Sequence, residues 1–243
     1  MTKITNNTNN QIGGSLSGVT EQFLVANDSN TASSTAISLK RVGGGSSGDP
    51  FHQYTVTGAT TFSKGIDNSD SDAYVIAAST ALGTTNCVRI ASTGEVNFPK
   101  QSAFLGTGAT RSDVTGNGNT YNIGSSATAF TSIYDQNSDF NTNGTYTAPV
   151  TGIAEVSGCI PLTGLLSTHT DSQILIASSN RNLKPLQGNP FKMANPATSM
   201  GWPFWGNVDV DAGDTIIISI EVFNGTLVVD LNLSTFYDGG ILY

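Results

Sequence analysis

The sequence has little charge, cysteine or histidine. Only 12% of its 243 residues are charged, and it contains two cysteines and two histidines. Its formal net charge of -8 argues against a nucleic-acid partner, because that affinity comes largely from lysine and arginine side chains that neutralise phosphates. The same charge disfavours an anionic membrane surface. Two histidines leave few side chains suited to general-base or metal chemistry near neutral pH.

Long apolar runs are missing as well. No stretch has about 18 unbroken apolar residues, and the polar start of the chain lacks the basic and apolar regions of a secretory signal. We therefore expect that the chain does not insert into a membrane and that it is made in a cytoplasm. Cys87 and Cys159 lie far apart, each in an apolar stretch, which favours buried free thiols over a disulfide.

The chain is instead rich in glycine, serine, threonine and asparagine, with valine and isoleucine among its apolar residues. This composition favours strands and turns over helices. Short alternating runs bounded by turn residues occur at 22–26, 36–42, 52–56, 73–77 and 87–91, and they predict a β meander. No window of about a dozen residues shows helical spacing with caps. The predicted fold class is all-β.

The strongest alternation lies near the C-terminus. In residues 215–223 and 227–234 every second residue is apolar: Ile216, Ile218, Ile220 and Val222, then Leu227, Val229, Leu231 and Leu233. Asn224 and Gly225 separate the two runs, and this dipeptide predicts a β-hairpin.

Composition also divides the chain. Residues 1–20 have few apolar anchors and are predicted to form an extended attachment segment. Residues 21–105 would form a β-rich shaft or shoulder domain. Residues 106–126 are a linker or a first strand, and residues 127–243 are the C-terminal head.

Several segments of the C-terminal half carry a resemblance to a known family. Asp135 and Phe140 precede the run GTYTAPVTG at 144–152, the turn DAGDT at 211–215 precedes an apolar strand, and residues 234–243 close the chain. Residues 127–243 thereby resemble the complement C1q globular head, a jelly roll of the tumour-necrosis-factor-like class. The resemblance implies a jelly-roll sandwich and a homotrimer.

Two segments of the front half carry a second resemblance. The runs SSGDPF at 46–51 and GIDNSDSDA at 65–73 resemble segments of fibre proteins of bacteriophages and other aquatic viruses. This implies a virion fibre or spike protein, not an enzyme, located on the virion. Its N-terminal segment would attach to other virion proteins, and its head would bind a host-surface glycan or protein. A capsid decoration or spike protein without a receptor is the alternative, and a polysaccharide depolymerase is less favoured.

Acidic clusters are the candidate metal sites. Carboxylate oxygens are ligands that Ca²⁺ prefers, but neither cluster has the glycine and glutamate of a helix-flanked calcium loop. Solvated turns are therefore favoured, with a structural Ca²⁺ as the alternative and no other cofactor expected. The two clusters are Asp67, Asp70 and Asp72, and Asp209, Asp211 and Asp214.

The candidate receptor-binding residues are aromatic or lie in a polar loop. Trp202 and Trp205 could stack on sugar rings or anchor a partner. The spacing of Trp202 and Phe204 also fits a core or trimer-contact strand, which is the favoured interpretation. His169 and Asp171 lie in a polar segment that predicts a loop.

A glycine-rich run at 43–48 has the letters of a dinucleotide-binding loop. Asp49 and Pro50 follow where a helix would have to begin, so we expect a turn and no nucleotide.

Overall fold

The structure is a computed structural model that describes residues 40, 42, 47–124, 130–194, 198–232 and 235–242. Nearly all the regular structure in these residues is β, with one short helix, α1 (Pro190–Ala194). The predicted all-β class is confirmed. In the part of the chain that the structure describes, no helix is both long and apolar enough to cross a membrane. The predicted segments 1–20, 22–26 and most of 36–42 lie outside the described residues.

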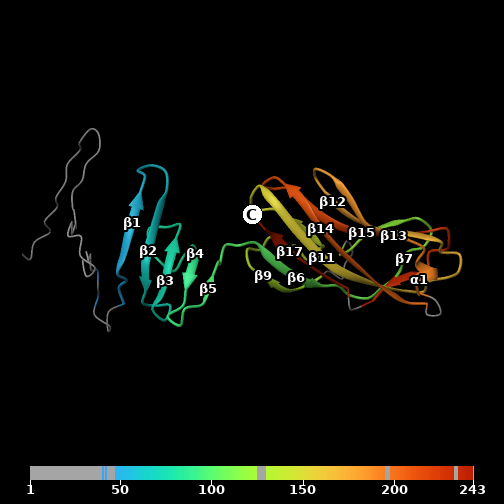
Figure 1. Cartoon of the computed structure of the whole chain (residues 1–243), viewed down its shortest axis with the longest axis horizontal. Helices are drawn as coiled ribbons and strands as arrows, with labels where there is room; N and C mark the ends of the chain where they lie inside the picture. The colour runs from blue at the N-terminus through green and yellow to red at the C-terminus, as the bar shows by residue number, and fades with distance from the viewer. Residues whose placement is uncertain are drawn as a thin grey trace, which may run out of the picture.

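The first five strands form an antiparallel meander (Figure 1). They are β1 (Phe51–Thr55), β2 (Thr61–Asp67), β3 (Ala73–Ala77), β4 (Asn86–Ile90) and β5 (Val96–Asn97). The predicted runs 52–56, 73–77 and 87–91 correspond to the first, third and fourth of these strands, whereas the second and fifth were not predicted. The sheet buries only a small core, made by Ala73, Val75, Ala77 and Leu82 with Phe51 packed against it. Its opposite face presents Tyr54 and Phe62, which pair across β1 and β2 and are both exposed.

The remaining strands form two sheets that face each other. The large sheet has seven strands in the order β7-β16-β11-β17-β6-β9, with β14 paired to β11. Its strands are β6 (Ala103–Thr107), β7 (Arg111–Thr115), β9 (Thr131–Asp135), β11 (Gly152–Thr163), β14 (Met200–Val210), β16 (Val229–Leu231) and β17 (Phe236–Ile241). The small sheet has the order β10-β15-β12-β13, with β8 paired to β15. Its strands are β8 (Thr120–Asn122), β10 (Thr145–Thr147), β12 (Asp171–Ser178), β13 (Asn182–Gly188) and β15 (Thr215–Phe223).

One continuous core fills the space between the two sheets, as in the predicted jelly-roll sandwich. In β15 the isoleucines at 216, 218 and 220 and Val222 are all fully buried, as their alternation predicts. Every second residue of β11 faces the same core, beginning with Ala154 and Val156. Trp202 and Phe204 of β14 are buried with them, which confirms the core interpretation for these two aromatics.

The Asn224–Gly225 turn is not a hairpin, so that prediction was wrong. β15 pairs with β12 on one side and with β8 and β10 on the other, which leaves no edge for the next strand. The chain instead crosses to the large sheet, where β16 pairs with β11 and β7. Asn224 has a φ of 69°, a left-handed conformation that asparagine tolerates, and this sharp turn allows the crossing.

Strands upstream of residue 127 also belong to the sandwich. β6 begins at Ala103 and pairs with β17, while β7 and β8 pair with β16 and β15. Residues 106–126 therefore supply strands to both sheets. Their few apolar residues gave little sign of this role, although Ile123 is buried in the core and Val114 and Tyr121 pack against it. Just upstream, Phe104 of β6 stacks on Phe140 with ring centroids 4.4 Å apart.

Candidate functional site

The outer face of the large sheet, which points away from the small sheet, carries a row of paired side chains. Trp205 pairs with Ser157, Ser157 with Asp238, Asp238 with Leu105, and Leu105 with Tyr134. Directly paired residues project on the same side of a sheet, so these five side chains form one line across it. The next such line contains Phe236, which pairs with Cys159 and Thr107.

This outer face exposes large apolar side chains. Trp205 is 58% exposed, Tyr134 45% and Phe236 40%. Trp205 and Tyr134 lie at the two ends of the row, with the polar Ser157 and Asp238 between them. Exposed aromatic side chains that flank a polar centre are typical of surfaces that contact another protein. The outer face is therefore the strongest candidate for binding another protein surface.

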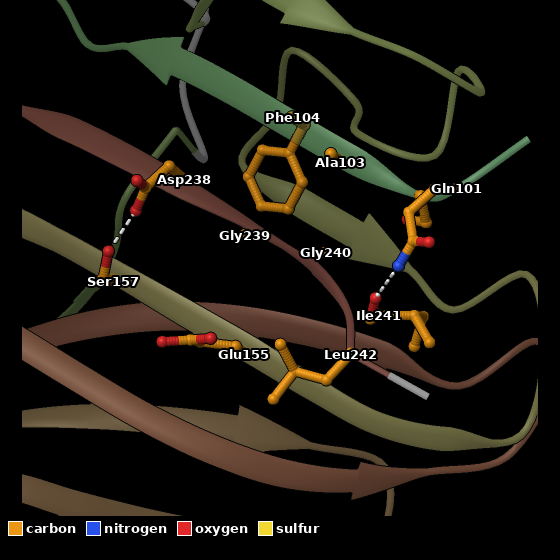
Figure 2. Close-up of a pocket in the computed structure, with 11 residues that line it drawn as sticks. Gln101, Ala103, Phe104, Glu155, Ser157, Asp238, Gly239, Gly240, Ile241 and Leu242 are labelled. Atoms are coloured by element: carbon orange, nitrogen blue, oxygen red, sulfur yellow. Dashed lines mark hydrogen bonds between the residues drawn. The ribbon is translucent and has the colours of Figure 1, made fainter. Parts of the chain in front are cut away.

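A hollow of about 400 Å³ opens on this face over β6, β11 and β17 (Figure 2). Its polar walls are Glu155, Ser157, Asp238 and Gln101. The Ser157 hydroxyl donates to the Asp238 carboxylate, and the Gln101 amide donates to the Ile241 carbonyl at 2.8 Å. A second hollow of about 270 Å³ shares Gln101 and Ile241 with the first, so the two form one groove.

Glu155 lines this groove and also contacts Trp205, the exposed aromatic residue at one end of the row. The indole Nε1 of Trp205 donates a hydrogen bond to Glu155 Oε1 at 2.6 Å. A charged acceptor makes this bond stronger than a neutral one, so the exposed ring is held in one orientation. The groove carries the carboxylates of Glu155 and Asp238 and therefore suits a partner group that is cationic or rich in hydrogen-bond donors.

An aromatic cluster packs directly beneath the groove. Phe104 stacks on Phe140 and lies 5.1 Å from Tyr146, while Tyr237 meets Phe104 edge-on at 4.9 Å. Asp135 accepts the backbone N–H of Asp139 at 3.0 Å and that of Phe140 at 3.3 Å. The aspartate, phenylalanine and tyrosine of the C1q-like run thus build a support for the outer face.

Burial perturbs the ionisable groups of this support. Desolvation raises the pKa of Tyr146 to about 12, although its hydroxyl shares a 2.8 Å hydrogen bond with Ser102. Burial also raises the pKa of Tyr237 and that of the Asp139 carboxyl. In all three groups of this support layer, burial disfavours the charged form relative to the same group in water.

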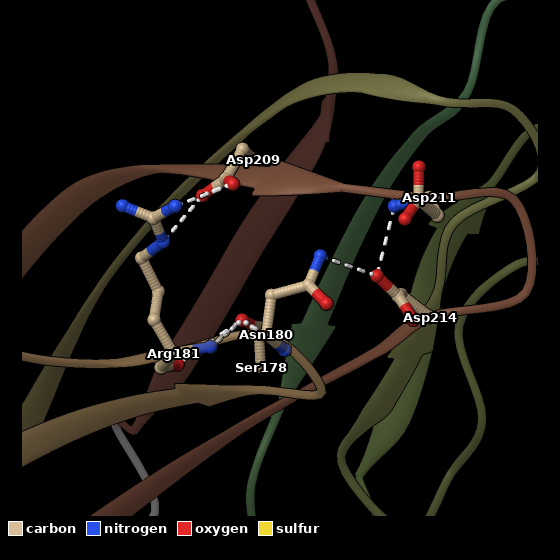
Figure 3. Close-up of polar contacts among 6 residues, drawn as sticks. All are labelled: Ser178, Asn180, Arg181, Asp209, Asp211 and Asp214. Carbon is tan, nitrogen blue, oxygen red and sulfur yellow. Dashed lines mark hydrogen bonds and ion pairs between the residues drawn. The ribbon is translucent and has the colours of Figure 1, made fainter.

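The C-terminal acidic cluster is engaged in turn contacts (Figure 3). Asp209 forms an ion pair with Arg181 at 2.6 Å, separately from the other two aspartates. Asp214 Oδ2 accepts the Asp211 backbone N–H at 2.8 Å and the Asn180 amide at 2.8 Å. These contacts tie the β14–β15 turn to the β12–β13 turn.

Two aspartates of the N-terminal acidic cluster, Asp67 and Asp70, also contact neighbouring side chains. Buried Asp67 accepts from the backbone and hydroxyl of Ser69, at 3.1 and 2.7 Å. Asp70 pairs with Arg89 at 2.5 Å, and this hydrogen bond lowers the pKa of Asp70. Asp72 has a φ of 58° in the turn before β3. Throughout the described part of the chain, no three His, Cys, Asp or Glu side chains come together as a metal site.

The receptor-binding candidates fall into two groups. Trp202 and His169 are fully buried, so neither contacts a partner unless the sandwich opens. For His169 this corrects the prediction of an exposed loop position, and for Trp202 it excludes the less favoured alternative of direct receptor contact. Trp205 is exposed on the outer face. Asp171 is partly exposed at the start of β12, where its carboxylate accepts the Ser172 backbone N–H at 2.9 Å.

Several residues of the outer face were not anticipated from the sequence. Tyr134 lies in a short strand that was not predicted, Phe236 was considered only as part of the closing segment, and Glu155 lies in a strand that was analysed only for its inward positions. Their proximity depends on the pairing of β6 with β9 and of β11 with β17. The two cysteines are free and partly buried, in line with the expected thiols.

No family model matches the sequence, and no curated protein does. Among solved structures, murine APRIL at pH 8.5 is similar with a TM-score of 0.40 and 13% identity, covering 59% of this chain and 100% of that chain. The globular domain of zebrafish complement 1qA protein has a TM-score of 0.40 and 16% identity, and the match covers 59% of this chain and 98% of that chain. Eiger TNF from S. frugiperda has a TM-score of 0.39 and 12% identity, and the match covers 59% of this chain and 94% of that chain. Similarity of this size says nothing of what the chain binds, and the sandwich assignment follows from the strand pairing itself.

Proposed function

We propose that the chain is a virion fibre or spike protein that works as a homotrimer and binds a host-surface glycan or protein through its C-terminal sandwich. The observation that carries the proposal is the outer face of the large sheet, which exposes the large apolar side chains of Trp205, Tyr134 and Phe236. Burying these side chains against other copies would remove them from water, which is worth about 25 cal/mol per Å² of apolar surface. Residues 1–20 would attach the trimer to other virion proteins.

The meander sheet supports the same arrangement. A five-stranded sheet with a core of a few small residues gains little stability from its own packing. Its outward Tyr54 and Phe62 would be covered if three copies of the sheet packed together. Trimerisation would also protect the strand edges that otherwise invite aggregation.

The oligomeric state is the first test. We expect sedimentation of the full chain to give three times its 25.2 kDa mass. Trp205→Glu places a carboxylate beside Glu155 on the outer face and should give a monomer. Met193→Glu is the matched control, because Met193 is 48% exposed on α1 and its sulfur lies beside Gly188 of the small sheet, so its substitution should leave the trimer intact. A wild-type monomer would refute the proposal.

Binding of the protein to host cells is the second test. Labelled full-length trimer should bind host cells saturably, and an excess of unlabelled trimer should compete. Deleting the sandwich from Ala103 onward should abolish this binding, since β6 is part of it. A trimer that shows no saturable binding would instead favour the alternative of a capsid decoration or spike protein without a receptor.

A further inference from the structure

Arg111 of β7 projects between the two sheets of the sandwich. It pairs with Leu231 of β16, and directly paired residues project on the same side of a sheet. Leu231 is 3% exposed and belongs to the core, so the Arg111 side chain enters the sandwich beside it. Because a guanidinium stays charged in proteins, this side chain carries a positive charge into an apolar interior.

Two hydrogen-bond donors of this guanidinium lack an acceptor. Nε and Nη2 of Arg111 are both buried and have no hydrogen-bond partner among the described residues. These two nitrogens form one edge of the guanidinium plane, and their N–H groups together can bind a carboxylate or a single anion. Buried polar groups are nearly always hydrogen-bonded, and a buried charge without a partner is costly. The pair of donors therefore points to an acceptor that the described residues do not supply.

Two other arginines of the chain show what this edge of a guanidinium binds. Arg89 places Nε 2.5 Å and Nη2 2.8 Å from the two carboxylate oxygens of Asp70. Arg181 places Nε and Nη2 each 2.6 Å from a carboxylate oxygen of Asp209. In both cases Nε and Nη2 bind an anionic group. Arg111 presents the same two donors inside the sandwich, where an anion would be held more strongly than at the surface.

A small hollow lies beside Arg111, between the two sheets. It has a volume of about 10 Å³, and its walls include Tyr121 of β8, Leu231 of β16, Phe130 and Thr235. A hollow of this size holds one particle about as large as a water molecule. None of the described residues that line it is acidic. The Thr235 hydroxyl donates to the Asn232 carbonyl at 2.9 Å, so its proton is used there.

The nearest carboxylate along β16 is directed elsewhere. Asp230 precedes Leu231, so its side chain projects to the opposite side of the strand. It accepts the Asp113 backbone N–H at 2.8 Å. The positive charge of Arg111 is therefore not balanced by its own sheet.

We propose that Arg111 binds a small monovalent anion of the halide class between the two sheets, with Nε–H and Nη2–H as its donors. The anion balances the charge of the guanidinium and so offsets the cost of burying it. A water molecule could accept the same bonds but would leave the charge unbalanced. Sulfate, phosphate and carboxylic acids are larger than the hollow. The site joins β7 and β16 of the large sheet to β8 of the small sheet, and it depends on neither the trimer nor a receptor.

Thermal unfolding of the full chain tests the site, with protein concentration, pH and ionic strength held constant. Sodium chloride replaces sodium gluconate stepwise, because gluconate is too large to enter the hollow. The melting temperature should rise by about 3 °C or more for each tenfold increase in chloride above its dissociation constant, since only the folded state binds the anion.

Variants separate this site from general effects of salt. Arg111→Met should lose the dependence on chloride. Arg181→Met is the matched control, because Arg181 pairs with Asp209 at the surface, and it should keep the dependence of the wild type. No chloride dependence in the wild type, or an equal dependence in Arg111→Met, would overturn the proposal.

A second measurement covers the case in which Arg111→Met fails to fold. Crystals of the wild-type chain grown in sodium bromide should show an anomalous scattering peak within hydrogen-bond distance of both Nε and Nη2 of Arg111. A side chain bound to these two nitrogens in place of bromide contradicts the proposal. Bromide found at surface positions alone is an adventitious ion only and contradicts it as well. Trimer formation and receptor binding have no bearing on either readout.

Discussion

Tyr237 is buried in the aromatic cluster, and its hydroxyl has no hydrogen-bond partner among the described residues. A buried polar group without a partner destabilises the folded state. Tyr237→Phe should therefore raise the free energy of unfolding by about 1 kcal/mol, measured by chemical denaturation. Tyr146→Phe is the matched control, because it breaks the bond to Ser102 and should lower that free energy by about 1 kcal/mol. Changes of the same sign in both variants would show that the hydroxyl environments are not as described.

Asp139 gives the support layer a defined response to pH. Burial raises its pKa above the value in the unfolded chain, so the folded state prefers the protonated acid. The stability this provides is fully present below the unfolded pKa and is lost as the pH rises through the folded pKa. Asp139→Asn should therefore gain melting temperature relative to wild type as the pH rises from about 4 to about 7. The exposed Asp113→Asn should show no such trend, and a trend equal to that of Asp139→Asn would contradict the assignment.

At the residue scale, the sequence identified interior positions well and loop positions poorly. Alternation has a period of two in every strand, so the inward sides of β11 and β15 could be predicted without knowing their partners. Trp202 was correctly favoured for the core. His169 was expected in an exposed loop because its neighbours are polar, but that loop folds back over the ring and buries it. Such burial depends on Thr226 and Gly225, more than fifty residues away along the chain.

Strand β11 crosses the middle of the large sheet and carries a glycine where an inward side chain would be expected. A Cβ on Gly158 would lie 2.3 Å from the Phe236 carbonyl oxygen and 2.5 Å from Phe204 Cζ. The Phe204 ring from the adjacent strand occupies that space. Gly158→Ala should therefore lower the free energy of unfolding by about 1–3 kcal/mol, because either the ring or the backbone must shift.

The matched control for this element is Gly201→Ala on the neighbouring strand β14. Gly201 is exposed, and a Cβ there would meet only the Cys159 sulfur at 3.2 Å. We expect its effect on stability to be small. Thermal unfolding of the two variants makes the comparison, and equal losses would mean that the inward space at Gly158 is not the cause.

At the element scale, local signals failed where pairing is decided by distant strands. Asn224–Gly225 has the residues of a hairpin turn, yet both edges of β15 are already paired, so the chain must leave that sheet. The boundary predicted between residues 105 and 106 divides β6, whose pairing with β17 puts the whole strand in the sandwich. The outer face has the same origin, since its row of side chains is assembled from five strands that no short motif connects.

The whole molecule combines a thin meander sheet with a sandwich that is well packed inside and apolar on one outer face. In a cyclic trimer, that face would point toward the other copies and would leave free the loops 164–170 and 224–228, which follow β11 and β15. Three identical heads on one rigid particle then provide three equivalent sites. Each site can be weak, because attachment of the first head raises the effective concentration of the others.

Avidity of this kind predicts how the monomeric variant should behave. Trp205→Glu should bind host cells about a hundredfold more weakly than wild type, even though each of its heads is folded. Fusing an unrelated trimeric coiled coil to the N-terminus of this variant restores three heads without restoring the outer face. We expect the fusion to recover most of the binding, as measured by flow cytometry across a concentration series. If the fusion is trimeric yet still does not bind, Trp205 itself contacts the receptor, and the outer face is a binding surface instead of a contact between copies.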